Sequence, residues 1–140
     1  MTSATAAVTA TLAALPAIGA TFEGGTFCGI TTLKDGRHHA VVLLPAKPDK
    51  SLAWSAANDW AHEVGGELPT RPVAALLYAN AKPQLQAAWH WTADTLDADT
   101  GDQDDASFAW GCDFNYGSQG CSPKSASGAA VAVRLIPLSA

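Results

Sequence analysis

The sequence of 140 residues predicts an α+β fold, in which a hairpin comes first, two helices follow and further strands end the chain. The hairpin is indicated by β-type sequence on both sides of Asp35-Gly36, and the helices by apolar residues at helical spacing. The first and last strands are expected to pair, with the helices on one side of the sheet. At this length we expect one compact domain.

Composition and charge narrow the classes of protein to which the chain can belong. Hydrophobic residues make up 48% and charged residues 15%, which is typical of a globular domain and not of a disordered chain. The net charge is −5 and the eight Lys and Arg are scattered, so we expect no nucleic-acid partner. No stretch reaches the ~20 apolar residues of a spanning helix, so we expect no membrane insertion.

Residues 1–20 differ in composition from the rest of the chain. They contain no aromatic and no charged residue. They therefore predict an N-terminal arm for attachment or oligomerisation, followed by one domain at 21–140. The arm lacks the basic start of a signal peptide, so we expect neither cleavage nor secretion.

The hairpin is predicted to consist of strands at 26–32 and 39–44, joined by a tight turn at Asp35-Gly36. Pro45 ends the second strand, because proline cannot donate a backbone hydrogen bond to a neighbouring strand.

The first helix is predicted at 52–64, with Ser51 as its N-cap. Gly65-Gly66 ends it, since glycine readily adopts the left-handed backbone of a helix C-terminus.

A second helix begins after Thr70, whose hydroxyl is a suitable N-cap. Pro72 is acceptable in its first turn, where backbone N–H groups have no partner within the helix. Lys82-Pro83 ends this helix.

Three more strands are predicted at 89–92, 107–114 and 130–136. The two connections between these strands are long for so small a domain and carry no predicted element. Long connections of this kind are usually functional or mobile.

Several short motifs together give more specific information than any of them alone. They include Leu68-Pro69-Thr70-Arg71, Leu76-Leu77-Tyr78-Ala79-Asn80, Trp89-x-Trp91-Thr92 and Ala132-Val133-Arg134. In combination they resemble the DUF1566 family, whose members include the C-terminal domain of a bacterial collagen-like adhesin and many phage tail-associated proteins. The resemblance covers about Phe22 to Ile136.

This resemblance implies a C-type-lectin-like fold, usually without enzymatic activity, in which irregular loops on a compact scaffold present a ligand-binding face. Members of this wider group often work as trimers or as the tips of fibres. The sequence departs from the family at Val73, where a Glu commonly stands two residues after the Arg. Arg71 must therefore find another acceptor.

Four residues are expected to be structural. Trp60 and Trp91 are predicted to lie in the core, and Arg71 and Arg134 belong to the motifs that resemble the scaffold of the family.

The candidate ligand-binding residues lie mainly in one polar segment. Asn115, Tyr116, Ser118 and Gln119 match the composition of adaptable binding surfaces, and Trp110 is a further candidate because its ring can stack on a sugar. An ordinary polar turn between two strands, with Trp110 in the core, is the alternative interpretation.

The acidic segment 94–105 raises the question of a metal. Its D-x-D spacing makes Asp97, Asp99 and Asp102 weak candidates for calcium, which binds six to eight oxygens. The segment lacks the Glu that closes an EF-hand loop, and a solvated acidic loop is the favoured interpretation. We expect no cofactor.

Three cysteines leave at least one thiol unpaired. Cys112 and Cys121 are candidates for a disulfide, and they are also the best indication of an enzyme, an oxidoreductase. Reduced or buried thiols are the alternative interpretation for all three, Cys28 included.

The sequence thus favours a non-enzymatic phage virion or tail-fibre protein that binds a glycan or protein of the host cell surface. We expect a homo-oligomer, with a trimer favoured, and contacts to other virion proteins through the arm. The alternatives are a decoration or cement protein of a capsid or tail, a secreted bacterial adhesin and an oxidoreductase.

Overall fold

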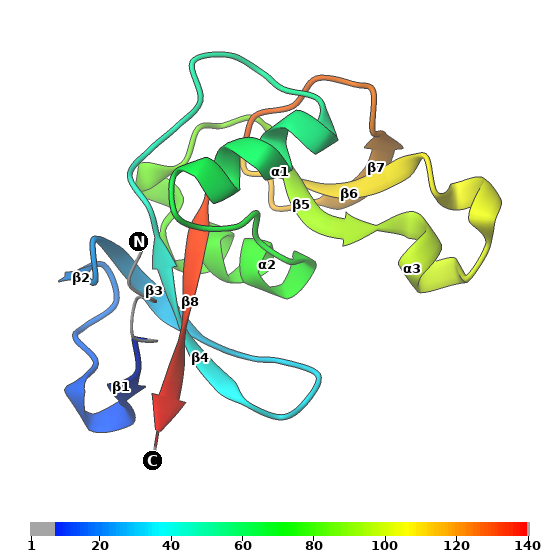
Figure 1. Cartoon of the computed structure of the whole chain (residues 1–140). Coiled ribbons are helices and arrows are strands. Elements are labelled where there is room, and N and C mark those ends of the chain that lie inside the picture. The colour runs from blue at the N-terminus through cyan, green and yellow to red at the C-terminus, as the bar shows by residue number, and fades with distance from the viewer. Residues whose placement is uncertain (1–7, 140) are drawn as a thin grey trace, which may run out of the picture.

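Residues 8–139 are described by a computed structural model, in which two sheets pack around a central helix (Figure 1). The strands are β1 (Ala10–Thr11), β2 (Thr21–Phe22), β3 (Gly25–Thr32), β4 (His38–Leu43), β5 (Trp89–Thr95), β6 (Phe108–Asp113), β7 (Gln119–Pro123) and β8 (Val133–Ser139). The helices are α1 (Trp54–Glu63), α2 (Arg71–Asn80) and α3 (Leu96–Thr100), with short 3-10 turns η1 (Leu12–Ala14), η2 (Lys82–Gln84) and η3 (Gln103–Asp105). The predicted α+β class is confirmed.

The five-stranded sheet has the order β1-β8-β4-β3-β2, and the predicted hairpin forms its centre as β3 and β4. Its turn is closed by the backbone N–H of Arg37, which donates to Asp35 Oδ1 at 2.9 Å, and Gly36 takes the left-handed backbone at φ +83°. The last strand joins this sheet, but the expected pairing of the first predicted strand, at 26–32, with the last strand was wrong: β8 pairs antiparallel with β4, the second strand of the hairpin, with Leu135 opposite Val41.

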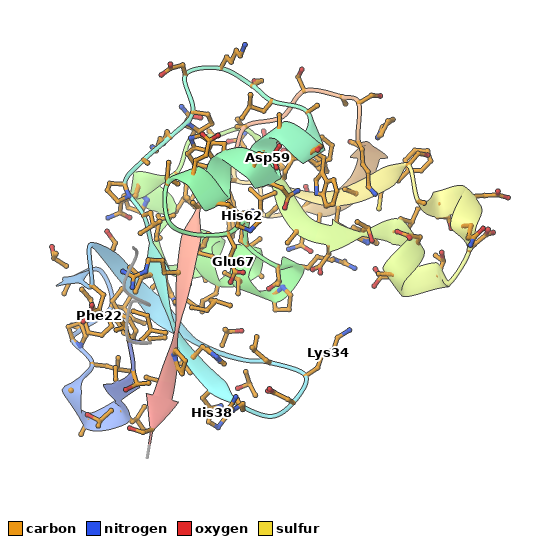
Figure 2. The ribbon with its side chains drawn as sticks, in the orientation of Figure 1. Phe22, Lys34, His38, Asp59, His62 and Glu67 are labelled. Atoms are coloured by element: carbon orange, nitrogen blue, oxygen red, sulfur yellow. The ribbon has the colours of Figure 1, made fainter. Side chains whose placement is uncertain are left out.

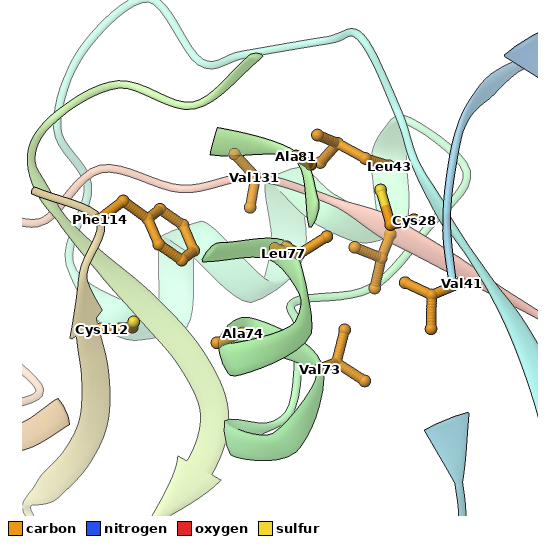
Figure 3. Close-up of a cluster of buried hydrophobic side chains, with 11 residues drawn as sticks. Cys28, Val41, Leu43, Val73, Ala74, Leu77, Ala81, Cys112, Phe114 and Val131 are labelled. Carbon is orange, nitrogen blue, oxygen red and sulfur yellow. The ribbon is translucent and has the colours of Figure 1, made fainter. Parts of the chain in front are cut away.

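The main core lies between the two sheets, with α2 at its centre. Leu77 of α2 is fully buried, with side chains of the five-stranded sheet on one side and of the three-stranded sheet on the other (Figure 3). Burial of such a side chain contributes ~1.5–3 kcal/mol to folding. The cluster comprises Cys28, Val41, Leu43, Val73, Ala74, Leu77, Ala81, Cys112, Phe114, Val131 and Val133.

The start of α1 differs from the prediction. Leu52 exchanges two backbone hydrogen bonds of 2.9 Å with Gly128, and this pairing holds its backbone extended. The helix therefore begins at Trp54, and its N-cap is Ala53, not Ser51. Its end agrees with the prediction, since Gly65 adopts φ +89°.

The start of α2 agrees with the prediction. The hydroxyl of Thr70 accepts a hydrogen bond from the backbone N–H of Val73 at 3.4 Å, and Pro72 lies in the first turn. The helix ends at Asn80, just before Lys82 and Pro83 begin η2.

The prediction of two long connections without structure was wrong. The acidic segment contains α3 and η3, and the segment after Phe114 contains β7, an edge strand of the three-stranded sheet β5-β6-β7. The strand predicted at 130–136 begins only at Val133, because the carbonyls of Ala129 and Ala132 accept hydrogen bonds from the backbone N–H groups of Trp91 and Leu44 instead of pairing within one strand.

Residues 8–20 of the expected arm lie against the domain. β1 pairs in parallel with β8, Ala10 opposite Leu138. Val8 and Leu15 pack on the face of the five-stranded sheet that is opposite α2, against Ile136. Residues 1–7 lie outside the described residues, and a role of the arm in attachment stays a prediction.

Candidate ligand-binding site

The Arg71 cluster, which comprises Arg71, Trp110, Gln119 and Asp99, forms at the N-terminal end of α2. The guanidinium carbon of Arg71 lies 3.5 Å from the centre of the Trp110 ring, a cation–π contact. Its Nε donates to Gln119 Oε1 at 2.9 Å, and Gln119 Nε2 donates back to the carbonyl of Arg71 at 2.9 Å. These two bonds fix both side chains in one geometry.

The sequence offers Arg71 no acceptor at position 73, and Gln119 of β7 supplies one. Val73 is only 1% exposed in the core and offers no acceptor side chain. Asp99 adds an ion pair at 3.4 Å, but the two side chains are 36% and 49% exposed. Such exposed pairs contribute little to stability, so Trp110 and Gln119 hold Arg71.

A tight turn at residues 113–118, hereafter the 113–118 turn, presents the other candidate residues. The N–H of Gly117 donates to the Asp113 carbonyl at 2.6 Å, and the N–H of Asn115 donates to Asp113 Oδ1 at 2.8 Å. The N–H of Asp113 donates in turn to the Ser118 carbonyl at 2.8 Å. Within this fixed backbone the side chain of Tyr116 is 76% exposed.

The C-terminal end of α2 supports the 113–118 turn. Gly117 lies against Tyr78 so closely that a Cβ at this position would be 2.7 Å from the ring, and its φ is +81°. Lys82 Nζ lies 4.8 Å from the centre of the Tyr78 ring and donates to the carbonyl of Asn115 at 3.4 Å. Tyr78 and Lys82 therefore hold the 113–118 turn against the C-terminal end of α2.

The five predicted ligand-binding residues thus divide into two groups. Trp110 and Gln119 belong to the Arg71 cluster, where their side chains contact protein. Asn115, Tyr116 and Ser118 are exposed on the 113–118 turn. The sequence did not indicate Tyr78 or Lys82 as part of the site. Tyr78 follows Arg71 by seven residues, which places both on the same side of α2, whereas Lys82 lies beyond the helix in η2.

The three candidate calcium ligands have separate surroundings. Asp99 faces Arg71, and Asp102 Oδ1 accepts from the backbone N–H of Asp104 at 3.0 Å as the cap of η3. Oδ1 of Asp97 is buried without a hydrogen-bond partner. In the part of the chain that the structure describes, no three His, Cys, Asp or Glu residues are arranged to hold a metal ion.

The candidate disulfide is not formed, and all three cysteines are free. Cys112 pairs with Gln119 across β6 and β7, while Cys121 pairs with Trp110, so the two thiols lie diagonally on one face. Diagonal positions are ~7–8 Å apart, too far for a disulfide without backbone movement. Burial raises the pKa of both thiols, which disfavours the reactive thiolate.

The remaining predicted structural residues contact the scaffold. Trp91 is fully buried, and its indole N–H donates to the carbonyl of Leu52 at 2.8 Å. Arg134 donates to the carbonyl of Glu23 at 2.7 Å, which holds the turn between β2 and β3. Trp60 of α1 is only partly buried against the second core cluster.

His90 is a buried titratable group that packs against Phe114 of the 113–118 turn. It is 1% exposed, its ring lies 4.6 Å from that of Phe114, and Nδ1 is 2.8 Å from the carbonyl of Ala88. Burial lowers the pKa of His90, and the hydrogen bond to Ala88 opposes this shift without cancelling it. The side chain is therefore neutral at pH 7.

Comparisons with known proteins do not identify a family. No protein-family model matches this sequence, and no curated protein does so either. Among residues 8–139, no helix is both long enough and apolar enough to cross a membrane.

Proposed function

We propose that this chain is a non-enzymatic, C-type-lectin-like protein of a phage virion, whose 113–118 turn contacts a glycan of the host cell surface. The observation that carries the proposal is the exposure of Tyr116, 76%, on a backbone fixed by four hydrogen bonds within the turn and one from Lys82. A tyrosine held in this way loses little conformational entropy when it binds.

The neighbours of Tyr116 supply what a sugar needs. An aromatic ring packs on the apolar face of a sugar, and the amide of Asn115 and hydroxyl of Ser118 offer both donors and acceptors for its hydroxyl groups. Both side chains are exposed beside Tyr116. The order of the elements, a hairpin followed by two helices and a second small sheet, is consistent with the lectin-like fold that the motifs suggest.

The test is adsorption to host cells and to a glycan array by the wild-type protein and by Tyr116→Ala. We expect the variant to lose most of its binding, because Tyr116 supplies the central apolar contact. The control is Lys34→Ala, in the turn of the β3–β4 hairpin that projects from the five-stranded sheet (Figure 2). Unchanged adsorption of Tyr116→Ala would contradict the proposed site.

The place of the protein in a virion requires a separate experiment. Deletion of residues 2–7 leaves the packing of Val8, Ala10 and Leu15 intact, whereas deletion of 2–20 would uncover Phe27. We therefore propose the shorter deletion, with incorporation into particles measured by mass spectrometry. A decoration protein would lose its place in the particle, and its isolated domain would bind no cells.

A further inference from the structure

A hollow of about 420 Å³ lies between α1 and the loop that precedes it, apart from the residues of the proposed site. One wall is a single face of α1, where Ala56, Asp59, Trp60 and Glu63 follow one another at helical spacing. This volume is within the range of small-molecule sites. The loop 47–52 forms the opposite wall.

The walls of this hollow are fixed by contacts elsewhere in the fold. Lys47 Nζ donates to the carbonyl of Gln84 at 2.9 Å, which fixes one end of the loop. At the other end Leu52 pairs with Gly128 and accepts from the indole of Trp91. The hollow therefore needs little rearrangement to receive a ligand.

Trp60 provides an aromatic surface whose polar group is not used by the protein. The indoles of Trp54 and Trp91 donate to backbone carbonyls, and that of Trp110 is buried. Among the described residues, the indole N–H of Trp60 has no protein acceptor and is not buried. A partly exposed ring with a free donor is typical of aromatic residues that bind ligands with one apolar and one polar side.

The rim of the hollow carries carboxylates that are not neutralised. Within residues 8–139 the only ion pair joins Arg71 and Asp99, so Asp59 and Glu63 have no cation within 4.0 Å. Figure 2 shows Asp59 on α1. Asp49 adds a third carboxylate on the loop side, where Lys47 and Lys50 also bring two ammonium groups, and Lys47 already donates to the carbonyl of Gln84. The α1 wall, with Asp59 and Glu63 beside Trp60, therefore accepts hydrogen bonds and disfavours an anionic group there.

We infer that this hollow binds a saccharide without negative charge, with a sugar ring on Trp60 and its hydroxyl groups donating to Asp59 and Glu63. Ionised carboxylates are strong acceptors for hydroxyl groups, and two of them spaced by four residues on one helix face reach the same ligand. This site is independent of the 113–118 turn.

The experiment is NMR titration of the ¹⁵N-labelled full chain, with the indole N–H signal of Trp60 as the readout. The probes are the trisaccharide of N-acetylglucosamine, its deacetylated form and the trisaccharide of galacturonic acid. We expect saturable shifts of the Trp60 signal with one or both of the first two probes and none with the acidic probe. Equal shifts with all three probes, or none with any, would overturn the inference.

Variants assign the binding to the rim and separate it from the proposed function. The double variant D59N/E63Q removes two exposed charges and leaves the packing of Trp60 against the second core cluster in place, and we expect affinity to fall about tenfold or more. Glu67→Gln is the matched control, because Glu67 is exposed and lies outside the hollow. Tyr116→Ala should bind these probes like the wild type, whether or not it still adsorbs to cells. Unchanged affinity of D59N/E63Q would refute the assignment.

Discussion

The two ends of α2 contact the three-stranded sheet in different ways. At the N-terminal end, Arg71 stacks on Trp110 and exchanges two hydrogen bonds with Gln119, so polar side chains are used to hold strand to helix. At the C-terminal end, Tyr78 supports a turn that leaves Tyr116 in solvent. Gln119 and Tyr116 lie only three positions apart in the sequence. Gln119 is bonded to Arg71 of the scaffold, whereas Tyr116 is exposed to solvent.

The largest effect on stability should come from the part of α2 that is buried between the two sheets. Leu77→Ala removes a fully buried side chain between the sheets and should lower the free energy of unfolding by ~3 kcal/mol. Urea denaturation measures this loss. Leu76→Ala, at a partly buried position, should cost clearly less. Equal losses would mean that the centre of α2 is not packed as described.

The contact between the 113–118 turn and α2 can be tested by Gly117→Ala. The substitution places a Cβ in the left-handed region and against the Tyr78 ring, so it should cost ~2 kcal/mol. Gly36→Ala is the control, since its φ is +83° but no atom lies within 4 Å of the added Cβ. Thermal unfolding measures the loss of stability in both variants. Equal losses would show that Tyr78 does not support the turn.

The Arg71 cluster can be tested by Arg71→Lys, which keeps the charge but loses the bond from Nε and the planar stack on Trp110. We expect a loss of ~1 kcal/mol in the free energy of unfolding. Asp99→Asn should change it by less than ~0.5 kcal/mol, because the ion pair is half-exposed. The opposite order of the two losses in chemical denaturation would make the ion pair the important contact.

The smallest effect on stability should come from Tyr116, the most exposed large hydrophobic side chain among the described residues. Tyr116→Ala should change the free energy of unfolding by less than ~0.5 kcal/mol, since its side chain contacts mainly water. Calorimetry of the variant beside the wild type measures this. A loss above ~1 kcal/mol would show that Tyr116 belongs to the scaffold and is not free to bind a ligand.

Local sequence signals predicted the elements whose ends are set by local chemistry. Thr70 and Pro72 place the start of α2, and Asp35-Gly36 places the hairpin, because these residues act on their own backbone. Leu52 shows the limit of such signals, since its pairing with a residue 76 positions away delays the start of α1.

The candidate site was predicted only in part for the same reason. The strand β7 was missed because Gly120, Ser122 and Pro123 are typical of turns, and only its pairing with β6 makes it extended. Gln119 therefore looked like a loop residue, although it contacts Arg71, 48 positions earlier. The exposure of Tyr116 follows from the composition of its own segment, and that part of the prediction agrees with the structure.

The pairing of Ala10 with Leu138 brings the two ends of the described chain to the same sheet, on the side of the molecule away from α3 (Figure 1). This arrangement suits circular permutation, which succeeds when termini are close together and the new break lies in an exposed turn. A short linker from Ser139 to Val8, with new ends opened at Gly36, would keep every strand pair of both sheets. Such a permuted chain would have its termini in the turn of the β3–β4 hairpin, and the 113–118 turn would stay unchanged.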